Sequence, residues 1–548
     1  MKKSVIKRVL SLALAFMSLV CFAACKKGGP SDSELVDVVP QNTPYDDSDL
    51  SLNTAATHTY AVSTSNRLAT QVGMKVLEEG GNAVDAAVAV AYTLTVVQPY
   101  ASGLGGGGCL ILYDPATNEY AFYDYFASMR STANESKHHI GVPGFVKGMD
   151  SVLNDYGTLD YEKLLSYAID YAKNGCPVTA DLETRINVAY ADLKHQKMFY
   201  NSDGKLLKLG DTLYSKDIAD VLQKIVDKGA DEFYKGSIAQ DITSHHSVTI
   251  TMEDMAAYTV EKSEPVISDF LGYEVAAAPA PFSGVTTIQM LRMAEALDIP
   301  NPATDPNGYL EDLTIISSKA YTDRYKTIAD PDFVKVNEQD LVSSKHIQKL
   351  LKDTDATVLD DPEHVSTTHF SIIDENGMVV SSTNTLSSFW GSRVYVDGVF
   401  LNDTLKHFGT AESINCPEAG KTPRSYACPM IIRGTEGYIL ALGTPGGNNI
   451  PKIIAPLLID YLKFGTDLQD AVFKGRIYSK SSDTLTVEKR EFFPSIADTE
   501  NAPYYIVARD DAAYFGSIAA VGYSPDKGRV FSVYDDRRGG TSVSANEN

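Results

Sequence analysis

The spacing of hydrophobic residues early in the chain predicts a strand followed by two helices. Residues 59–64 (TYAVST) have the composition of a short strand, and Leu68 and Val72 then begin a run of apolar residues at helical spacing. Residues 80–99 are so rich in alanine and valine that we expect a helix buried on every side. A glycine-rich turn at residues 102–108 then leads into another strand.

A second pattern, strong enough to set a register, lies in the middle of the chain. Residues 368–374 and 378–385 alternate like paired strands, and residues 375–377 (ENG) form a loop of hairpin length. This loop places residue 374 opposite residue 378, so Thr367 lies opposite Thr385. Opposite residues share a face with their Cβ atoms about 5 Å apart. On the hairpin alone, an ordinary polar cross-strand pair is the simpler interpretation of the two threonines.

The N-terminal 24 residues have the pattern of a secretory signal. A basic start precedes an apolar run that is shorter than the roughly 20 residues of a membrane-spanning helix. Small residues directly before Cys25 resemble a bacterial lipobox, which predicts that Cys25 carries lipid; a plain cleaved signal is the alternative. Residues 25–56 are rich in Gly, Pro, Ser and Asp, as in a flexible tether, so ordered structure should begin near Thr57.

Composition excludes some classes of function. The 548-residue chain is 44% hydrophobic with a net charge of −23, and loss of residues 1–24, with four basic residues and no acid, makes it −27. Such an acidic surface argues against nucleic acid as a partner. The glycine-rich turn lacks the Gly-Lys-Ser/Thr ending of a phosphate loop. Four widely spaced cysteines remain after the signal, without the spacing of a zinc site, and one disulfide stays possible.

Several long motifs resemble one enzyme family. They are, in chain order, GGNAVDAAVAVA, ASGLGGGG, HIGVPGFVKGM, PFSGVTTIQML, AYTDRYKTIADPDF, TTHFSIID, LNDTLKHFG and GTPGGNNIPKI. Together they resemble the γ-glutamyltransferase family over residues 57–541. The strings VVSSTNTLS and DDRRGGT, with the lipobox-like start, are most similar to its capsule branch, the surface-anchored poly-γ-glutamate depolymerases and transferases.

The resemblance implies a fold and a maturation step. The expected fold is α+β, an N-terminal-nucleophile (Ntn) hydrolase with an αββα four-layer sandwich. A precursor of this kind cuts itself, here between Ser366 and Thr367. Residues 57–366 would then form the large subunit and residues 367–548 the small one.

The resemblance also implies catalytic roles. Thr367 would be the nucleophile, with its own freed α-amine as the base. Thr385 would orient it by a hydrogen bond, and Gly446 and Gly447 would donate backbone N–H groups to the oxyanion. This chemistry requires no metal and no organic cofactor.

The residues that hold the glutamyl head group depart from the family pattern. The implied substrate-binding positions are Phe126, Ser387, Thr404, His407, Arg424 and Ser425. Among them Phe126 replaces an arginine, His407 an acid and Ser387 an asparagine, while Asn449 replaces the arginine of the capsule branch. Cations that could compensate are Arg130, Lys406, Arg424, Arg537 and Arg538. Apart from Arg424, whose equivalent the capsule branch also carries, a solvent-exposed surface role is the simpler interpretation of each.

Three functions remain open at this point. The leading hypothesis is a lipid-anchored γ-glutamyl hydrolase or transferase outside the cytoplasmic membrane, acting on poly-γ-glutamate or γ-glutamyl peptides with water or an amine as acceptor. The second is an Ntn acylase on a different amide, with an apolar pocket at Phe126. The third is a non-catalytic surface lipoprotein that retains the fold.

Overall fold

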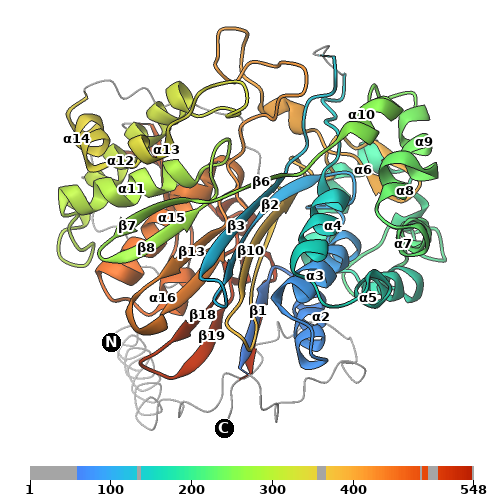
Figure 1. Ribbon diagram of the computed structural model, residues 1–548, viewed down its shortest axis with the longest axis horizontal. Helices are drawn as coiled ribbons and strands as arrows, with labels where there is room; N and C mark the ends of the chain where they lie inside the picture. Colours follow the sequence, from blue (N-terminus) through green and yellow to red (C-terminus); the bar gives the residue numbers. More distant parts are fainter. Residues whose placement is uncertain (1–58, 133–136, 354–365, 482–483, 491–503, 546–548) are drawn as a thin grey trace, which may run out of the picture. The chain divides into compact units, whose positions relative to one another are not determined.

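Two antiparallel sheets stacked face to face form the centre of the structure (Figure 1). The computed structural model describes residues 59–132, 137–353, 366–481, 484–490 and 504–545. The first sheet has seven strands, in the order β20 (Thr541–Ala545), β1 (Tyr60–Thr64), β9 (Thr368–Ile373), β10 (Val379–Thr385), β2 (Gly107–Asp114), β3 (Glu119–Tyr125) and β6 (Glu261–Ser263). The second has six, in the order β19 (Arg529–Val533), β18 (Ala519–Ser524), β14 (Ile439–Gly443), β13 (Met430–Arg433), β8 (Tyr273–Ala277) and β7 (Val266–Phe270).

The two-residue period of the strands assigns each side chain to one of two cores. Along β2, Cys109 and Ile111 point to the space between the sheets, where they join Ile431 of the second sheet. The alternate residues Leu110 and Leu112 face the helices on the other side. Both sides are apolar because neither face of this sheet is left to solvent.

One helical layer covers the seven-stranded sheet. Its helices are α2 (Arg67–Glu78), α3 (Ala83–Val97), α4 (Phe145–Tyr156), α5 (Tyr161–Asn174), α6 (Ala180–Leu193), α7 (Lys216–Lys228), α8 (Asp231–Lys235), α9 (Ser237–Ser244) and α10 (Met252–Ala257). Helix α3 is buried at every residue, as its Ala/Val composition predicts, and it starts at a capping box formed by Asn82 and Asp85. The other elements predicted for this part of the chain are also present: the first strand is β1, the helix after it is α2, and the strand after the glycine-rich turn is β2.

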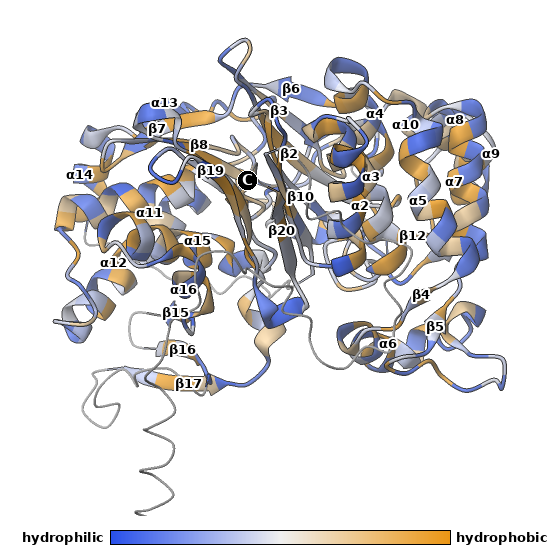
Figure 2. Cartoon of the chain, turned by 90° about the horizontal axis from the view of Figure 1, so that it is seen from below, coloured by the Kyte–Doolittle hydropathy of each residue, from blue (hydrophilic) through white to orange (hydrophobic). Residues whose placement is uncertain are grey.

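A second helical layer covers the six-stranded sheet and completes an αββα sandwich (Figure 1). Its helices are α11 (Gly284–Leu297), α12 (Pro306–Thr327), α13 (Glu338–Leu341), α14 (Ser344–Lys352), α15 (Ile450–Leu458) and α16 (Leu468–Phe473). In Figure 2 the outer helices alternate between hydrophilic and hydrophobic residues along their length, as expected for helices with one buried face. The predicted four-layer α+β arrangement is therefore confirmed.

The remaining strands form small sheets outside the sandwich. They are β4 (Cys176–Pro177) with β5 (Thr212–Leu213), β11 (Tyr395–Val396) with β12 (Val399–Phe400), and β15 (Ile477–Ser481), β16 (Thr484–Glu488) and β17 (Tyr505–Arg509). No helix in the described ranges is long and apolar enough to cross a membrane. The signal, Cys25 and the tether predicted from the sequence lie outside the described residues.

Candidate active site

The hairpin β9–β10 has the register that the sequence predicts. Asn384 pairs with Thr368 and Thr383 with His369, so the next pair outward is Thr367 with Thr385. The Oγ1 of Thr367 donates a hydrogen bond to the Oγ1 of Thr385 at 3.0 Å. Both side chains are largely buried, with exposed fractions of 8% and 6%. The opposed hydroxyls are therefore in direct contact.

The backbone at Thr367 is strained. Its φ is +111°, in a region that favours glycine and that costs other residues about 1–3 kcal/mol. The preceding Ser366 is fully buried, and its hydroxyl donates to the carbonyls of Tyr100 and Ala101, each at 3.3 Å. The predicted cleavage junction is thus held in an unfavourable conformation by the hydrogen bonds of Ser366 on one side and by that of Thr367 to Thr385 on the other. Sequence reasoning missed Tyr100 and Ala101, although they directly precede the glycine-rich turn.

That turn lies against Thr385, which explains its glycines. A Cβ at Gly106 would lie 2.3 Å from the carbonyl oxygen of Thr385, and one at Gly105 would lie 2.3 Å from that of Phe400. No side chain fits at either distance. The hydroxyl of Thr385 also accepts a hydrogen bond from the backbone N–H of Ser387, at 2.8 Å.

Gly446 and Gly447 form a turn between β14 and α15. Their φ values of +146° and +57° both favour glycine. Helix α15 follows directly, and the N-terminal end of a helix concentrates backbone N–H groups suited to a developing negative charge. Strand β14, which leads into the turn, packs across the sheets against β9, which begins one residue after Thr367.

Three of the predicted substrate-binding residues come together beside this hairpin. The Oγ of Ser387 and the Nε2 of His407 are 2.7 Å apart. The ring of His407 meets that of Phe126 edge-on, with centroids 6.3 Å apart, and Phe126 meets Phe282 at 5.8 Å. A hydroxyl–imidazole pair against two phenyl rings therefore lies where the sequence resemblance implies a charged clamp.

Thr404 follows Asp403, a buried carboxylate that sequence reasoning missed and that forms an ion pair with the partly exposed Lys406. Asp403 is fully buried and accepts hydrogen bonds from the N–H (2.9 Å) and hydroxyl (2.7 Å) of Ser388. Burial alone would raise the pKa of Asp403, but Lys406 and Ser388 together hold it below its usual value. The hydroxyl of the buried Thr404 has no hydrogen-bond partner among the described residues. The acidic residue within LNDTLKHF was the available signal for this pair.

Arg424 and Ser425 lie in a tightly held segment before β13. The guanidinium of Arg424 stacks on Tyr325 at 4.5 Å, and its backbone N–H donates to Asn415 at 2.9 Å. The N–H of Ser425 donates to the carbonyl of Pro281 at 3.1 Å. These contacts fix the backbone of both residues.

The surface interpretation, which covers every candidate cation except Arg424, is wrong for Arg130, Arg537 and Arg538 and holds only for Lys406. Arg130, Arg424, Arg537 and Arg538 are all buried, and only Lys406 is substantially exposed. An arginine side chain can be buried when other residues accept hydrogen bonds from its N–H groups. Those acceptors can lie far from the arginine in the sequence, so composition does not predict the burial.

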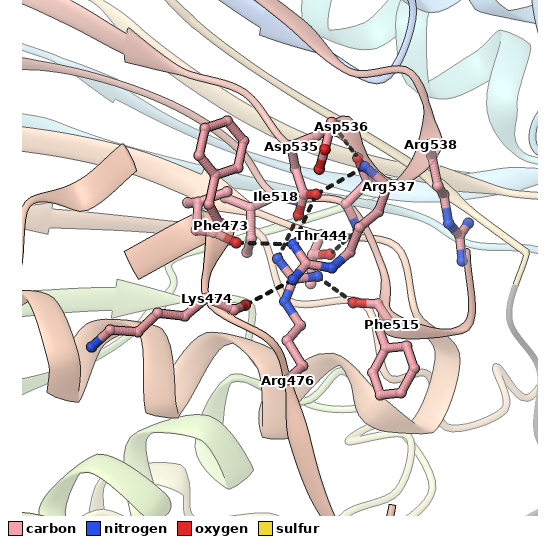
Figure 3. A network of polar contacts seen from close by, with 12 residues as sticks. Thr444, Phe473, Lys474, Arg476, Phe515, Ile518, Asp535, Asp536, Arg537 and Arg538 are labelled. Carbon is pink, nitrogen blue, oxygen red and sulfur yellow. Dashed lines mark hydrogen bonds and ion pairs between the residues drawn. The ribbon is translucent and has the colours of Figure 1, made fainter. Parts of the chain in front are cut away.

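Arg537 illustrates such partners. Its guanidinium donates to Glu488 at 2.7 Å. It also donates to Asp535 at 3.0 Å, and Asp535 in turn binds Arg476 (Figure 3). Because these ion pairs occupy its guanidinium, Arg537 stabilises the fold and is not a substrate ligand. In contrast, Arg538 points away from this network, and its Nη1 donates to the carbonyl of Thr367 at 3.4 Å.

Metal and disulfide chemistry have no visible support in the described part of the chain. Cys109, Cys176, Cys416 and Cys428 are free thiols. No group of three or more His, Cys, Asp or Glu residues is arranged to hold a metal ion within the same ranges.

Comparison with known proteins identifies the family. The gamma-glutamyltranspeptidase family model matches residues 69–545. The chain belongs to this family. The sequence-based family prediction is confirmed, and the Ntn hydrolase fold follows from it.

Two curated proteins and one solved structure are similar to this chain over most of its length. The capsule biosynthesis protein CapD proenzyme of Bacillus anthracis is 37% identical over 88% of this chain and 90% of its own length. The glutathione hydrolase proenzyme of Escherichia coli is 30% identical over 87% and 90%. The crystal structure of cephalosporin acylase from Bacillus halodurans has the same fold, with a TM-score of 0.80 and 24% identity over 93% of this chain and 99% of the other.

Proposed function

We propose that this protein is a self-processing γ-glutamyl hydrolase or transferase with Thr367 as its nucleophile. The observation that carries the proposal is the hydrogen bond between the hydroxyls of Thr367 and Thr385 at a strained junction. The chain's relatives in the gamma-glutamyltranspeptidase family include two proteins named as proenzymes. Under this proposal the uncut chain is the precursor.

Processing uses the same hydroxyl as catalysis. The Oγ1 of Thr367 attacks the carbonyl carbon of Ser366, the C–N bond to Thr367 breaks, and the nitrogen takes up the proton. Water then hydrolyses the resulting ester, which leaves a carboxylate on Ser366 and a free α-amine on Thr367. Thr385 accepts the hydroxyl hydrogen of Thr367 in the precursor and so orients the oxygen lone pairs. Cleavage also relieves the strain at φ +111°.

In turnover the freed α-amine takes the proton of the Thr367 hydroxyl as its oxygen attacks the γ-carbonyl of the donor. The N–H groups of Gly446 and Gly447 stabilise the oxyanion, a contribution typically worth about 10²–10³ in rate for one donor. The amine product leaves with the proton, and water or an amine then releases the acyl group. Apart from the donor and the water or amine acceptor, the groups in this cycle are the Thr367 hydroxyl, its α-amine and the N–H groups of Gly446 and Gly447.

The site favours a polymeric donor over a small one. The Ser387 hydroxyl and His407 imidazole satisfy each other, and Phe126 offers no charge, so the α-carboxylate and α-amine of a small donor lack their usual partners. A polymer can add contacts at successive residues, with Thr404, Arg424 and Ser425 as the nearby polar positions. Poly-γ-glutamate is thus the preferred substrate class, with γ-glutamyl peptides second. The relative named as a capsule biosynthesis protein is consistent with a polymeric substrate.

Location follows from the N-terminal sequence. We infer that residues 1–24 direct export, that Cys25 carries the lipid, and that residues 25–56 tether the enzyme to the outer face of a bacterial cytoplasmic membrane. An enzyme at this surface has access to extracellular polymer as substrate. We expect no nucleic-acid partner.

Product analysis after incubation with poly-γ-glutamate, γ-glutamyl peptides and simple N-acyl amides tests the function. Release of γ-glutamyl products by wild type, and none by Thr367→Ala, supports it. The aromatic pair Phe126 and Phe282 favours one other outcome, cleavage of an N-acyl amide with an apolar acyl group. No product from any donor, with an uncut chain, would make the protein a binding module.

A further inference from the structure

The guanidinium of Arg538 reaches the main chain of the proposed nucleophile. Its Nη1 donates to the carbonyl oxygen of Thr367 at 3.4 Å, and its Nε donates to the carbonyl of Ala513 at 3.0 Å. The backbone nitrogen and carbonyl oxygen of one residue are at most about 3.6 Å apart. The charge of Arg538 therefore lies within about 7 Å of the nitrogen that becomes the α-amine.

Arg538 is held in this position by its neighbours. It ends the short helix η7 (Asp536–Arg538), whose N-cap Asp535 accepts the N–H and the guanidinium of Arg537. Figure 3 shows Arg537 directed into the buried network and Arg538 directed away from it. The ion network thus anchors the segment that presents Arg538 to Thr367.

The other titratable groups around this point carry little net charge. On α6, Asp181 pairs with Arg185 at 3.0 Å and accepts the hydroxyl of Tyr100 at 2.7 Å. Burial raises the pKa of Tyr100 well above its usual value, so it stays neutral. Burial lowers the pKa of His369, two residues beyond Thr367, to about 3, so it is neutral as well.

Arg538 itself stays charged at neutral pH. Burial lowers its pKa to about 10, while Asp181 and, to a smaller extent, Asp511 favour the charged form. Arg538 therefore brings a positive charge into contact with the main chain of Thr367.

We propose that Arg538 keeps the α-amine freed on Thr367 in its neutral, proton-accepting form at neutral pH. A nearby positive charge disfavours a second one, so the ammonium form is destabilised. An ordinary α-amine with a pKa of about 7.8 is only about one-seventh neutral at pH 7, and a downward shift of one unit raises that fraction about fourfold. This role rests on the proposed cleavage, because the amine exists only afterwards.

The test compares the pH dependence of kcat/KM, measured with a chromogenic γ-glutamyl anilide, in wild type, Arg538→Gln and Arg538→Lys. We expect the midpoint of the acid limb to rise by about one unit in Arg538→Gln and to stay near wild type in Arg538→Lys, which retains the charge. Arg433→Gln, a change of equal charge at a distant pair with Glu274, controls for net charge. An unchanged midpoint with a raised KM in Arg538→Gln would make Arg538 only a substrate contact and overturn the proposal.

A second measurement decides the matter if Arg538→Gln does not fold or mature. The rate at which acetic anhydride modifies the N-terminal amine of Thr367 in the mature wild-type protein is followed against pH by mass spectrometry. A midpoint clearly below the ordinary value of about 7.7–8.0 supports the proposal, and one at or above that value overturns it. If wild type is never cut at Ser366–Thr367, it is instead the proposed function that fails.

Discussion

The imidazole of His369 occupies the space that a side chain at residue 443 would fill. A Cβ at Gly443 would lie 2.3 Å from the Cε1 of His369. The ring is fully buried and fixed by the hydroxyls of Thr383 at 2.8 Å and Ser371 at 3.1 Å. Because His369 follows Thr367 by two residues and Gly443 precedes the Gly446–Gly447 turn, this contact sets the spacing of the two sheets at the proposed site.

Gly443→Ala should therefore impair both stability and maturation. Overpacking of a core typically costs about 1–3 kcal/mol, and here the strain would push apart the nucleophile and the oxyanion donors. Thermal unfolding and the rate of chain cleavage measure the two effects. Gly103→Ala is a matched control, since a Cβ there meets nothing within 4 Å. Equal behaviour of the two variants would contradict the spacing role.

Stability should depend on pH through Asp124. Burial raises its pKa to about 7 although the N–H of Phe126 donates to it at 2.8 Å. Between about pH 4 and 7 the carboxyl of Asp124 is therefore protonated in the folded protein but ionised in the unfolded chain, where its pKa is about 3.9. The contribution of Asp124 to the free energy of unfolding is lost as pH rises through this range.

Asp124→Asn removes this titration. In urea unfolding, the variant should gain stability relative to wild type as pH is raised from about 4 to 7. Asp203→Asn, at an exposed loop position, should show no such trend. Parallel profiles of Asp124→Asn and wild type would show that Asp124 ionises normally.

Wild type should mature into two pieces, residues 25–366 and 367–548. At the chain average of 59.5 kDa for 548 residues, their 342 and 182 residues correspond to about 37 and 20 kDa before lipid. Thr367→Ala lacks the attacking hydroxyl and should remain one band on denaturing electrophoresis, whereas Thr367→Ser should still cut. Cleavage of the alanine variant at the same bond would rule out this nucleophile.

Specificity should respond to the residues that replace the clamp. Unpaired polar groups in a buried site cost roughly 1–3 kcal/mol each, more when charged. The double change Phe126→Arg with His407→Asp should therefore raise kcat/KM for glutathione and alter that for poly-γ-glutamate little. The single change Phe126→Leu serves as a control that adds no charge. Wild type that hydrolyses glutathione as fast as the polymer would show that other residues hold the head group.

Cys25→Ser should abolish attachment of the lipid. Membrane fractionation with mass spectrometry of the N-terminus is the measurement, and the variant is expected in the soluble fraction or as uncleaved precursor. An unmodified N-terminus on secreted wild-type protein would disprove the lipid anchor.

The sequence predicts those parts of the fold that depend on residues close together in the chain. The loop at residues 375–377 and the two-residue period were enough to place Thr367 against Thr385, because a hairpin register depends only on neighbouring residues. The contact of Arg538 with Thr367 joins positions 171 residues apart and leaves no local signal. Arg537 was misjudged for the same reason, since its partner Glu488 lies 49 residues away.

The order of strands has a consequence for the mature protein. In the seven-stranded sheet, β1 lies between β20 and β9, and β10 pairs with β2, so strands from before and after Ser366–Thr367 are interleaved. In the six-stranded sheet, β13 pairs with β8 across the same division. Breaking the chain at this junction leaves every ladder intact, and the two polypeptides can separate only by dismantling both sheets. Dilution should then not dissociate them, and mixed batches should not exchange partners without unfolding.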